Sequence, residues 1–253
     1  TRPRRIAPDD AINSTIALST ANAKAFGVNF GAGFIDGEVQ FSNTFAFDFD
    51  PTDGITPGTY DFIGVAVHEI GHALGFISGA DDFDYSDGYP GPVDNAWWGY
   101  GLDMFRYSAP GQLDWTPGTD SYFSIDGGVT ALWDGHFSTG TNFGDGYQAS
   151  HWLQPDTPCV NFRGIMNPYI CNGVADAVTG LDLALFDAIG WNLKTEATQG
   201  YNFSTSQMYR AFGAVPEPGV WALMISGFAM TGLMLRRRPR RAATPTPAAT
   251  IVW

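Results

Sequence analysis

The stretch HEIGHALGF, residues 68–76, carries two histidines four positions apart, with a glutamate directly after the first. On a helix, residues at this spacing lie on one face and one turn apart, so both imidazoles can reach one cation. A catalytic zinc site takes three protein ligands and keeps one position for water. We therefore predict that His68 and His72 bind Zn²⁺, that Glu69 is the catalytic general base, and that a third ligand comes from elsewhere.

Two sources of this third ligand are excluded by the sequence. The only glutamates further along the chain are Glu196 and Glu217, which lie in a polar stretch and in a Val-Pro-Glu-Pro motif. The short zinc pattern HExxHxxGxxH is matched as far as Gly75, but its last position is Ser78. Because a serine is a poor zinc ligand, this pattern is not completed.

A distant histidine is the remaining source, and the chain offers His136 and His151. His136 lies among Gly and Asp in WDGHFS, which is typical of an exposed loop. HEIGHALGF, a long insertion, SHW at 150–152 and IMNPY at 165–169 follow one another in an order that resembles the metzincin metalloproteases, and among them the leishmanolysin-like branch. The resemblance, which covers residues 61–191, implies that His151 is the third zinc ligand.

The same resemblance implies further roles and a fold. Met166 would form the Met-turn below the zinc, and Tyr169, three residues later, is a candidate donor to the transition state. The implied fold is α+β. A twisted mixed sheet would lie above the cleft, the HExxH helix would form its floor, and the Met-turn and a C-terminal helix would follow. The insertion, residues 76–150, aligns with no family member residue by residue.

Local patterns predict the elements that must position these side chains. Asp61 is the expected N-cap of a helix over 62–74, and Gly75 is its expected end. A second helix is predicted from Thr179, which is followed three residues later by an acidic residue. The other expected elements are a helix over 9–26 and strands over 39–49, 102–107 and 122–125.

Two further features carry predictions. Cys159 and Cys171 bracket Met166, and a lone close pair in an exported protein predicts a disulfide, whereas a cytosolic protein would keep free thiols. A second metal site at these cysteines lacks other ligands nearby. The stretch DDFDYSDG, residues 81–88, holds four carboxylates. It is a candidate Ca²⁺ site, and a solvated acidic turn is the alternative.

The C-terminus carries a topological signal. Val-Pro-Glu-Pro at 215–218 precedes an uncharged apolar stretch, residues 219–235, and then the cluster RRRPRR. At about 1.5 Å per residue this stretch is just long enough to cross a bilayer core. Residues 215–241 resemble the PEP-CTERM sorting signal of exported bacterial proteins. The resemblance implies an exosortase-type sorting enzyme as a partner, transient anchoring in the inner membrane, and a location in the cell envelope or outside the cell.

Charge argues against one class of partner. All 26 acidic residues lie between Asp9 and Glu217, whereas eight of the 13 basic residues lie in the first five positions or within 236–241. A body this acidic repels phosphate backbones, so we expect no nucleic-acid partner. The predicted organisation is a catalytic domain over 1–193, a linker over 194–214, the sorting signal over 215–241 and a tail over 242–253.

Two hypotheses about function follow. The leading one is a zinc-dependent endopeptidase acting on a protein or peptide substrate, in which Glu69 takes a proton from zinc-bound water and delivers it to the leaving amine. The alternative is an exported surface or biofilm-matrix protein whose metal site only stabilises the fold. Glu69 discriminates between them, because a structural zinc site fills its four positions with protein ligands and needs no unliganded glutamate.

Overall fold

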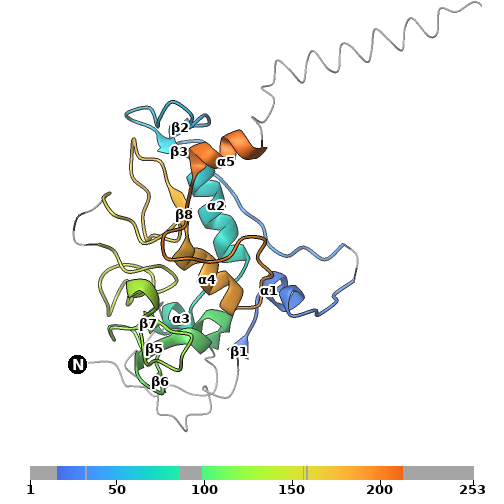
Figure 1. Cartoon of the computed structure of the whole chain (residues 1–253), viewed down its shortest axis with the longest axis vertical. Coiled ribbons are helices and arrows are strands. Elements are labelled where there is room, and N and C mark those ends of the chain that lie inside the picture. Colours follow the sequence, from blue (N-terminus) through green and yellow to red (C-terminus); the bar gives the residue numbers. More distant parts are fainter. Residues whose placement is uncertain (1–15, 32, 86–98, 156, 158, 213–253) are drawn as a thin grey trace, which may run out of the picture. The chain divides into compact units, whose positions relative to one another are not determined.

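Helix α2 (Phe62–Ala73) carries the HEIGH pattern and runs through the middle of the described part of the chain (Figure 1). The computed structural model describes residues 16–31, 33–85, 99–155, 157 and 159–212. The helices are α1 (Thr20–Ala25), α2, α3 (Gly79–Tyr85), α4 (Gly180–Ala188) and α5 (Thr205–Phe212), and the 3₁₀ helices are η2 (Gly101–Phe105) and η3 (Leu132–Asp134).

The described strands form four small sheets in place of the single twisted sheet that was expected, so the fold is mixed α/β. Strand β1 pairs with β4 and β2 with β3, both in parallel, whereas β5 pairs with β6 and β7, and β8 with β9, in antiparallel. The strands are β1 (Ile16–Ala17), β2 (Phe47–Asp48), β3 (Tyr60–Asp61), β4 (Gly99–Tyr100), β5 (Arg106–Ala109), β6 (Gln112–Leu113), β7 (Tyr122–Phe123), β8 (Ala177–Thr179) and β9 (Asn202–Ser204).

Both predicted ends of α2 are confirmed. The carboxylate of Asp61 accepts a hydrogen bond from a backbone N–H of the first turn, at 3.1 Å. Gly75 has φ +114°, a conformation that residues with a Cβ rarely adopt. At this end the N–H of Phe76 donates to Gly71 O (3.1 Å) and that of Gly75 to His72 O (3.0 Å), the Schellman arrangement. The chain therefore reverses directly after the second histidine.

The helix predicted from Thr179 is α4, and it begins with a capping box between Thr179 and Asp182. Its apolar stripe, Leu181, Leu185 and Ile189, belongs to one buried cluster with Ile165 and Met166 of the segment that carries IMNP. The core is one cluster of buried side chains from α4 and its C-cap, from IMNP, from the insertion and from Trp152 just after it: Phe76, Leu102, Phe123, Phe137, Trp152, Ile165, Met166, Leu181, Leu185 and Ile189. This cluster joins the insertion to the C-terminal part, and Val67 of α2 packs against it.

Other predicted elements are shorter than expected. Residues 9–15 of the predicted first helix lie outside the described residues, residues 16–17 form β1, and α1 begins only at Thr20. The side chain of Ser19 accepts from the N–H of Asn22, which fixes the helix start there. Of the strand expected over 39–49, only β2 is paired. Alternating polarity alone does not form a strand where no neighbouring edge is available.

The segment expected as a linker over 194–214 contains β9 and α5. Strand β9 pairs with β8, Thr205 and Met208 are buried, and Arg210 donates to the carbonyl of Thr52 at 2.9 Å. Helix α5 also contacts α2. The first compact unit of the chain therefore extends to Phe212, beyond the boundary at 193 that the sequence suggested.

The expected location in the cell envelope through a C-terminal membrane anchor is corrected by the structure. Among the described residues, no helix combines the length and the apolar character needed to cross a membrane. The chain divides after Phe212, and the second unit, residues 213–253, lies outside the described residues. The sorting-signal-like motif at 215–241 and the stretch 219–235 both fall within it.

Candidate metal centre

Three histidines meet at one point. The Nε2 atoms of His68, His72 and His151 lie 3.2 Å from one another in all three pairs. Three nitrogens held about 2.0–2.1 Å from a tetrahedral zinc ion lie roughly 3.3 Å apart, so the spacing fits such an ion. Within the described ranges, no other group of His, Cys, Asp and Glu is arranged so that it could hold a metal ion.

The second nitrogen of each ring contacts a backbone carbonyl. Nδ1 of His68 lies 2.8 Å from the oxygen of Ile165, and the other two rings make the same kind of contact with Phe76 O (2.8 Å) and Gln148 O (3.1 Å). A carbonyl oxygen only accepts, so each Nδ1 carries the proton and donates it. The Nε2 lone pairs are therefore free to bind a metal, which is the usual arrangement of metal-ligating histidines.

The electrostatic setting keeps two of the rings neutral. Burial, together with the neighbouring His72, lowers the pKa of His68 to about 4. Burial lowers the pKa of His151 to about 3, with further contributions from His72 and His68. At neutral pH both rings are therefore in the unprotonated form that binds metals.

Two structural devices bring the rings together. His68 and His72 lie one turn apart on α2, and the reversal at Gly75 returns Phe76 O to the second ring. His151 follows the insertion, and the N–H of the next residue, Trp152, donates to Met166 O at 2.9 Å. The indole of that tryptophan is buried in the core.

Met166 lies directly against α2. Its side chain is fully buried, and a Cβ placed on Gly71, between the two histidines of the helix, would overlap its Sδ. Asp182 holds this segment from the other side, since its carboxylate accepts from the N–H groups of Ile165 (2.9 Å) and Met166 (3.4 Å) and from the indole of Trp152 (2.8 Å). The methionine thus lies next to the helix turn that carries the ligands.

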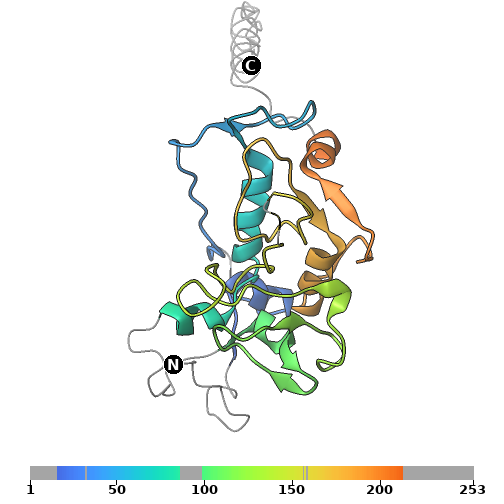
Figure 2. The same cartoon turned by 90° about the vertical axis from the view of Figure 1, so that its left-hand side faces the viewer.

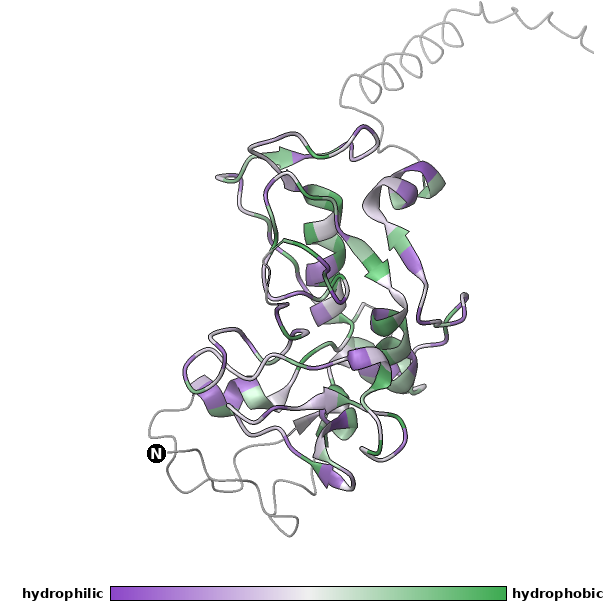
Figure 3. Ribbon diagram, turned by 60° about the vertical axis from the view of Figure 1, so that its left-hand side comes forward, coloured by the Kyte–Doolittle hydropathy of each residue, from purple (hydrophilic) through white to green (hydrophobic). Residues whose placement is uncertain are grey.

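Glu69 is a half-buried residue in a cleft, next to the ligands. Among the described residues, the segment after α1 runs along α2 towards β2 (Figure 2). Two hollows share Gln40 and Glu69 in their linings. The smaller, of about 320 Å³, is lined by both Glu69 and His72. The larger, of about 430 Å³, is lined by Gln40, Phe41, Ser42, Phe45, Phe47, Tyr60, Val65, Glu69 and Ile170. Figure 3 shows that α2 mixes hydrophobic and hydrophilic residues along this length.

Tyr169 lies in the disulfide loop. The predicted bond between Cys159 and Cys171 is confirmed. The Tyr169 hydroxyl accepts from the backbone N–H of Cys159 (3.1 Å) and from the side-chain amide of Gln154. Both contacts come from residues that precede the Met166 segment. The role of Tyr169 as a transition-state donor stays a prediction.

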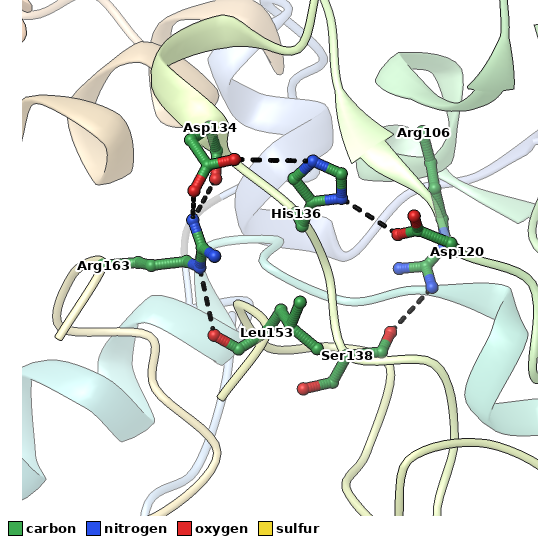
Figure 4. Close-up of polar contacts among 7 residues, drawn as sticks. All are labelled: Arg106, Asp120, Asp134, His136, Ser138, Leu153 and Arg163. Carbon is green, nitrogen blue, oxygen red and sulfur yellow. Dashed lines mark hydrogen bonds and ion pairs between the residues drawn. The ribbon is translucent and has the colours of Figure 1, made fainter. Parts of the chain in front are cut away.

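His136 lies apart from the cluster of His68, His72 and His151. Its Nδ1 is 2.9 Å from a carboxylate oxygen of Asp120, and its Nε2 is 3.6 Å from one of Asp134 (Figure 4). Arg163 binds the other side of Asp134. This arrangement agrees with a loop histidine held by acidic neighbours.

The described aspartates of DDFDYSDG accept hydrogen bonds from other segments of the fold. Asp81 accepts hydrogen bonds from the backbone of residues 149–150, and Asp84 accepts from that of residues 142–143. These carboxylates belong to no group that could hold a metal ion among the described residues. The prediction of Ca²⁺ therefore gains no support, and the stretch from residue 86 on lies outside the described residues.

The sequence did not identify Asp81 and Asp182 as parts of the site. Asp182 was visible only as the acidic residue of a capping box, and its bonds to Trp152 and Ile165 depend on the tertiary fold. The structure brings the three histidines together with Met166 and leaves His136 outside. Comparisons of this chain with family models, with curated proteins and with solved structures found no match, so the resemblance to the metzincins stays a prediction.

Proposed function

We propose that this protein is a zinc-dependent endopeptidase, with His68, His72 and His151 as ligands and Glu69 as general base. One observation carries the proposal. Three Nε2 atoms lie 3.2 Å apart, and each ring is fixed through Nδ1 on a backbone carbonyl. Three histidine ligands beside an open cleft correspond to a catalytic site, because a structural site takes a fourth protein ligand.

Glu69 supplies the proton transfer in this proposal. A zinc ion supplies Lewis-acid chemistry, since it polarises a carbonyl and acidifies water. The carboxylate of Glu69 takes the proton from the attacking water and delivers it to the nitrogen of the leaving amine. Its position next to His68 on α2, in a hollow shared with His72, favours this role.

The larger hollow favours a polypeptide substrate with an apolar side chain near the scissile bond. Phe41, Phe45, Phe47 and Tyr60 line it together with Glu69. The ring of Phe45 lies edge-on to that of Tyr60 at 5.9 Å, so the wall is built from aromatic surfaces. Burial of an apolar substrate side chain there would contribute about 1.5–3 kcal/mol to binding.

The Glu69→Gln variant tests the proposal. Zinc content, measured by inductively coupled plasma mass spectrometry, should remain at one ion per chain, because Glu69 is not a ligand. Cleavage of a peptide library should fall by about 10²–10⁴-fold, the usual contribution of a general base. If the zinc-loaded wild type cleaves no peptide, the metal site is structural and the endopeptidase is ruled out. If the variant cleaves as fast as the wild type, Glu69 is not the general base.

A further inference from the structure

We propose that Asp81 is a positioning residue for the third metal ligand and holds the backbone just before His151 in place. Asp81 lies on α3, inside the insertion of residues 76–150, for which the sequence offered no role. The inference rests on the proposed function, because it concerns the same metal site. The insertion thereby gains a role, because it provides the residues that support His151, the ligand that follows the insertion.

The carboxylate of Asp81 accepts three hydrogen bonds from two consecutive residues. The N–H of Ala149 donates to Oδ1 at 2.6 Å, and the N–H of Ser150 donates to Oδ2 at 3.0 Å. The hydroxyl of Ser150 donates to Oδ2 as well. Both carboxylate oxygens are therefore used, and both point at the segment that leads into His151.

These two residues separate the histidine from its own hydrogen-bond partner. Nδ1 of His151 donates to the carbonyl of Gln148 at 3.1 Å, and this contact orients the ring. Ala149 and Ser150 are the residues between them. Because Asp81 fixes both, it sets the position of the carbonyl relative to the ring, and thereby the direction of Nε2.

Ser150 is held from the far side too. Its hydroxyl oxygen accepts from the N–H of Ser78 at 2.9 Å, and the hydroxyl of Ser78 donates to Asp103 at 2.6 Å. Asp103 also accepts from the N–H of Gly79, at the start of α3. Ser78 is the position at which the short zinc pattern would carry a histidine. Here it supports the third ligand indirectly, through its backbone.

The buried Arg106 completes the support. Its guanidinium donates to the carbonyls of Ala149 (3.1 Å) and Ser138 (2.8 Å, Figure 4). The N–H of Ser138 in turn donates to the carbonyl of His151 at 3.0 Å. Burial raises the pKa of Asp81, and the hydrogen bonds from Ser150 and Ala149 together with the positive charge of Arg106 oppose this shift.

A carboxylate is required at this position for a chemical reason. An ionised carboxylate is acceptor-only, and three donors converge on it here. In the Asp81→Asn variant one oxygen becomes an NH₂ group, which would face a backbone N–H of Ala149 or Ser150. The segment should then shift, while the overall volume of the side chain stays the same.

Asp84 provides a matched control on the same helix. Its carboxylate also accepts from two consecutive backbone N–H groups, those of Asn142 and Phe143, both at 2.8 Å. It is buried and holds the same insertion. The segment it holds, however, does not lead directly into a metal ligand. Asp84→Asn should therefore cost stability without changing metal affinity.

The experiment compares wild type, Asp81→Asn and Asp84→Asn. Zinc affinity is measured by competition with a chromophoric chelator, the Co²⁺ form by its d–d absorption, and apo stability by urea unfolding. We expect Asp81→Asn to bind zinc about 10–100-fold more weakly, as for other residues that support a metal ligand, and to alter the Co²⁺ spectrum. We expect Asp84→Asn to keep wild-type affinity and spectrum. If Asp81→Asn does not fold, Ser150→Ala, which removes one of the three bonds, should weaken zinc several-fold.

The outcomes separate this inference from the proposed function. Equal zinc affinity and equal Co²⁺ spectra for Asp81→Asn and wild type overturn the positioning role and leave the endopeptidase intact. An equal loss of affinity in both aspartate variants also overturns it, because a general loss of structure then explains the effect. A wild type that binds no zinc overturns both.

Discussion

Each of the three histidine rings is fixed by a carbonyl from a different distance along the chain. His72 and His151 use carbonyls four and three residues away, whereas His68 uses that of Ile165, 97 residues later. The first two rings are oriented by local turns. The ring of His68 is oriented only when the segment that carries Met166 has docked against α2, so metal affinity reports on that docking.

Substitutions of the single residues His151 and His136 should have opposite effects on zinc binding. His151→Ala removes one of the three proposed ligands and should abolish tight zinc binding and activity. His136→Ala removes contacts to Asp120, Asp134 and the ring of Tyr122 and should retain both zinc binding and activity. Zinc content after dialysis and peptide cleavage check this. Retained zinc in the first variant together with lost zinc in the second would show that the ligand assignment is wrong.

Among the elements, the start of α2 contains a strained pair of acidic residues. Asp61 caps the helix and also accepts from the backbone N–H of Asp176 at 3.1 Å. The side chain of Asp176 lies over Gly64, buried against the first turn. Burial, with the nearby charges of Asp61 and Asp182, raises the pKa of Asp176 to about 7.

This pair predicts a stabilising substitution. The pKa of Asp176 is higher in the folded than in the unfolded chain, so its ionisation destabilises the fold increasingly as pH rises from about 4 to 7. Asp176→Asn removes that cost and can donate to Asp61. At about 1.4 kcal/mol per pKa unit, the gain in unfolding free energy should be about 2–3 kcal/mol larger at pH 8 than at pH 5. Urea unfolding of both proteins at the two pH values measures it, and an equal gain at both would contradict the shift.

The elements also show what a sequence can predict. The ends of α2 depend on Asp61 and Gly75, which act within a few residues, so both were predictable. The segment 39–49 alternates in polarity but lies along α2, and strand pairing depends on a partner that the local pattern does not reveal. Asp81 looked like part of a calcium loop, because only the tertiary fold brings Ser150, 69 residues away, to its carboxylate.

For the whole molecule, the cluster of three histidines makes stability depend on pH. His68 and His151 are neutral in the fold down to about pH 4 and 3, whereas in the unfolded chain they protonate near 6.5. As pH falls below 6.5 the unfolded state therefore binds protons that the apo fold does not, and stability is lost until the folded pKa values are reached. Above pH 6.5 the contribution of both rings is fully present.

Several buried carboxylates have the opposite effect on how stability changes with pH. The pH dependence of the unfolding free energy of the apo protein therefore does not report on the histidines alone. The burial that lowers the histidine pKa values raises those of Asp103 and Asp182. Comparison of apo wild type with apo His151→Ala cancels these groups, since both proteins contain them. The remaining difference reports the protonation of one ring.

The difference in unfolding free energy between apo wild type and apo His151→Ala should depend on pH. Between about pH 6 and 4, apo wild type should lose stability relative to apo His151→Ala by up to about 1.4 kcal/mol per pH unit. This is the slope expected when the unfolded state binds one proton more than the folded state. Urea unfolding in the presence of a chelator at pH 7.5, 6.0 and 5.0 measures the difference. A constant difference across this range would mean that His151 is solvated in the apo fold, and that the three rings converge only when a metal draws them together.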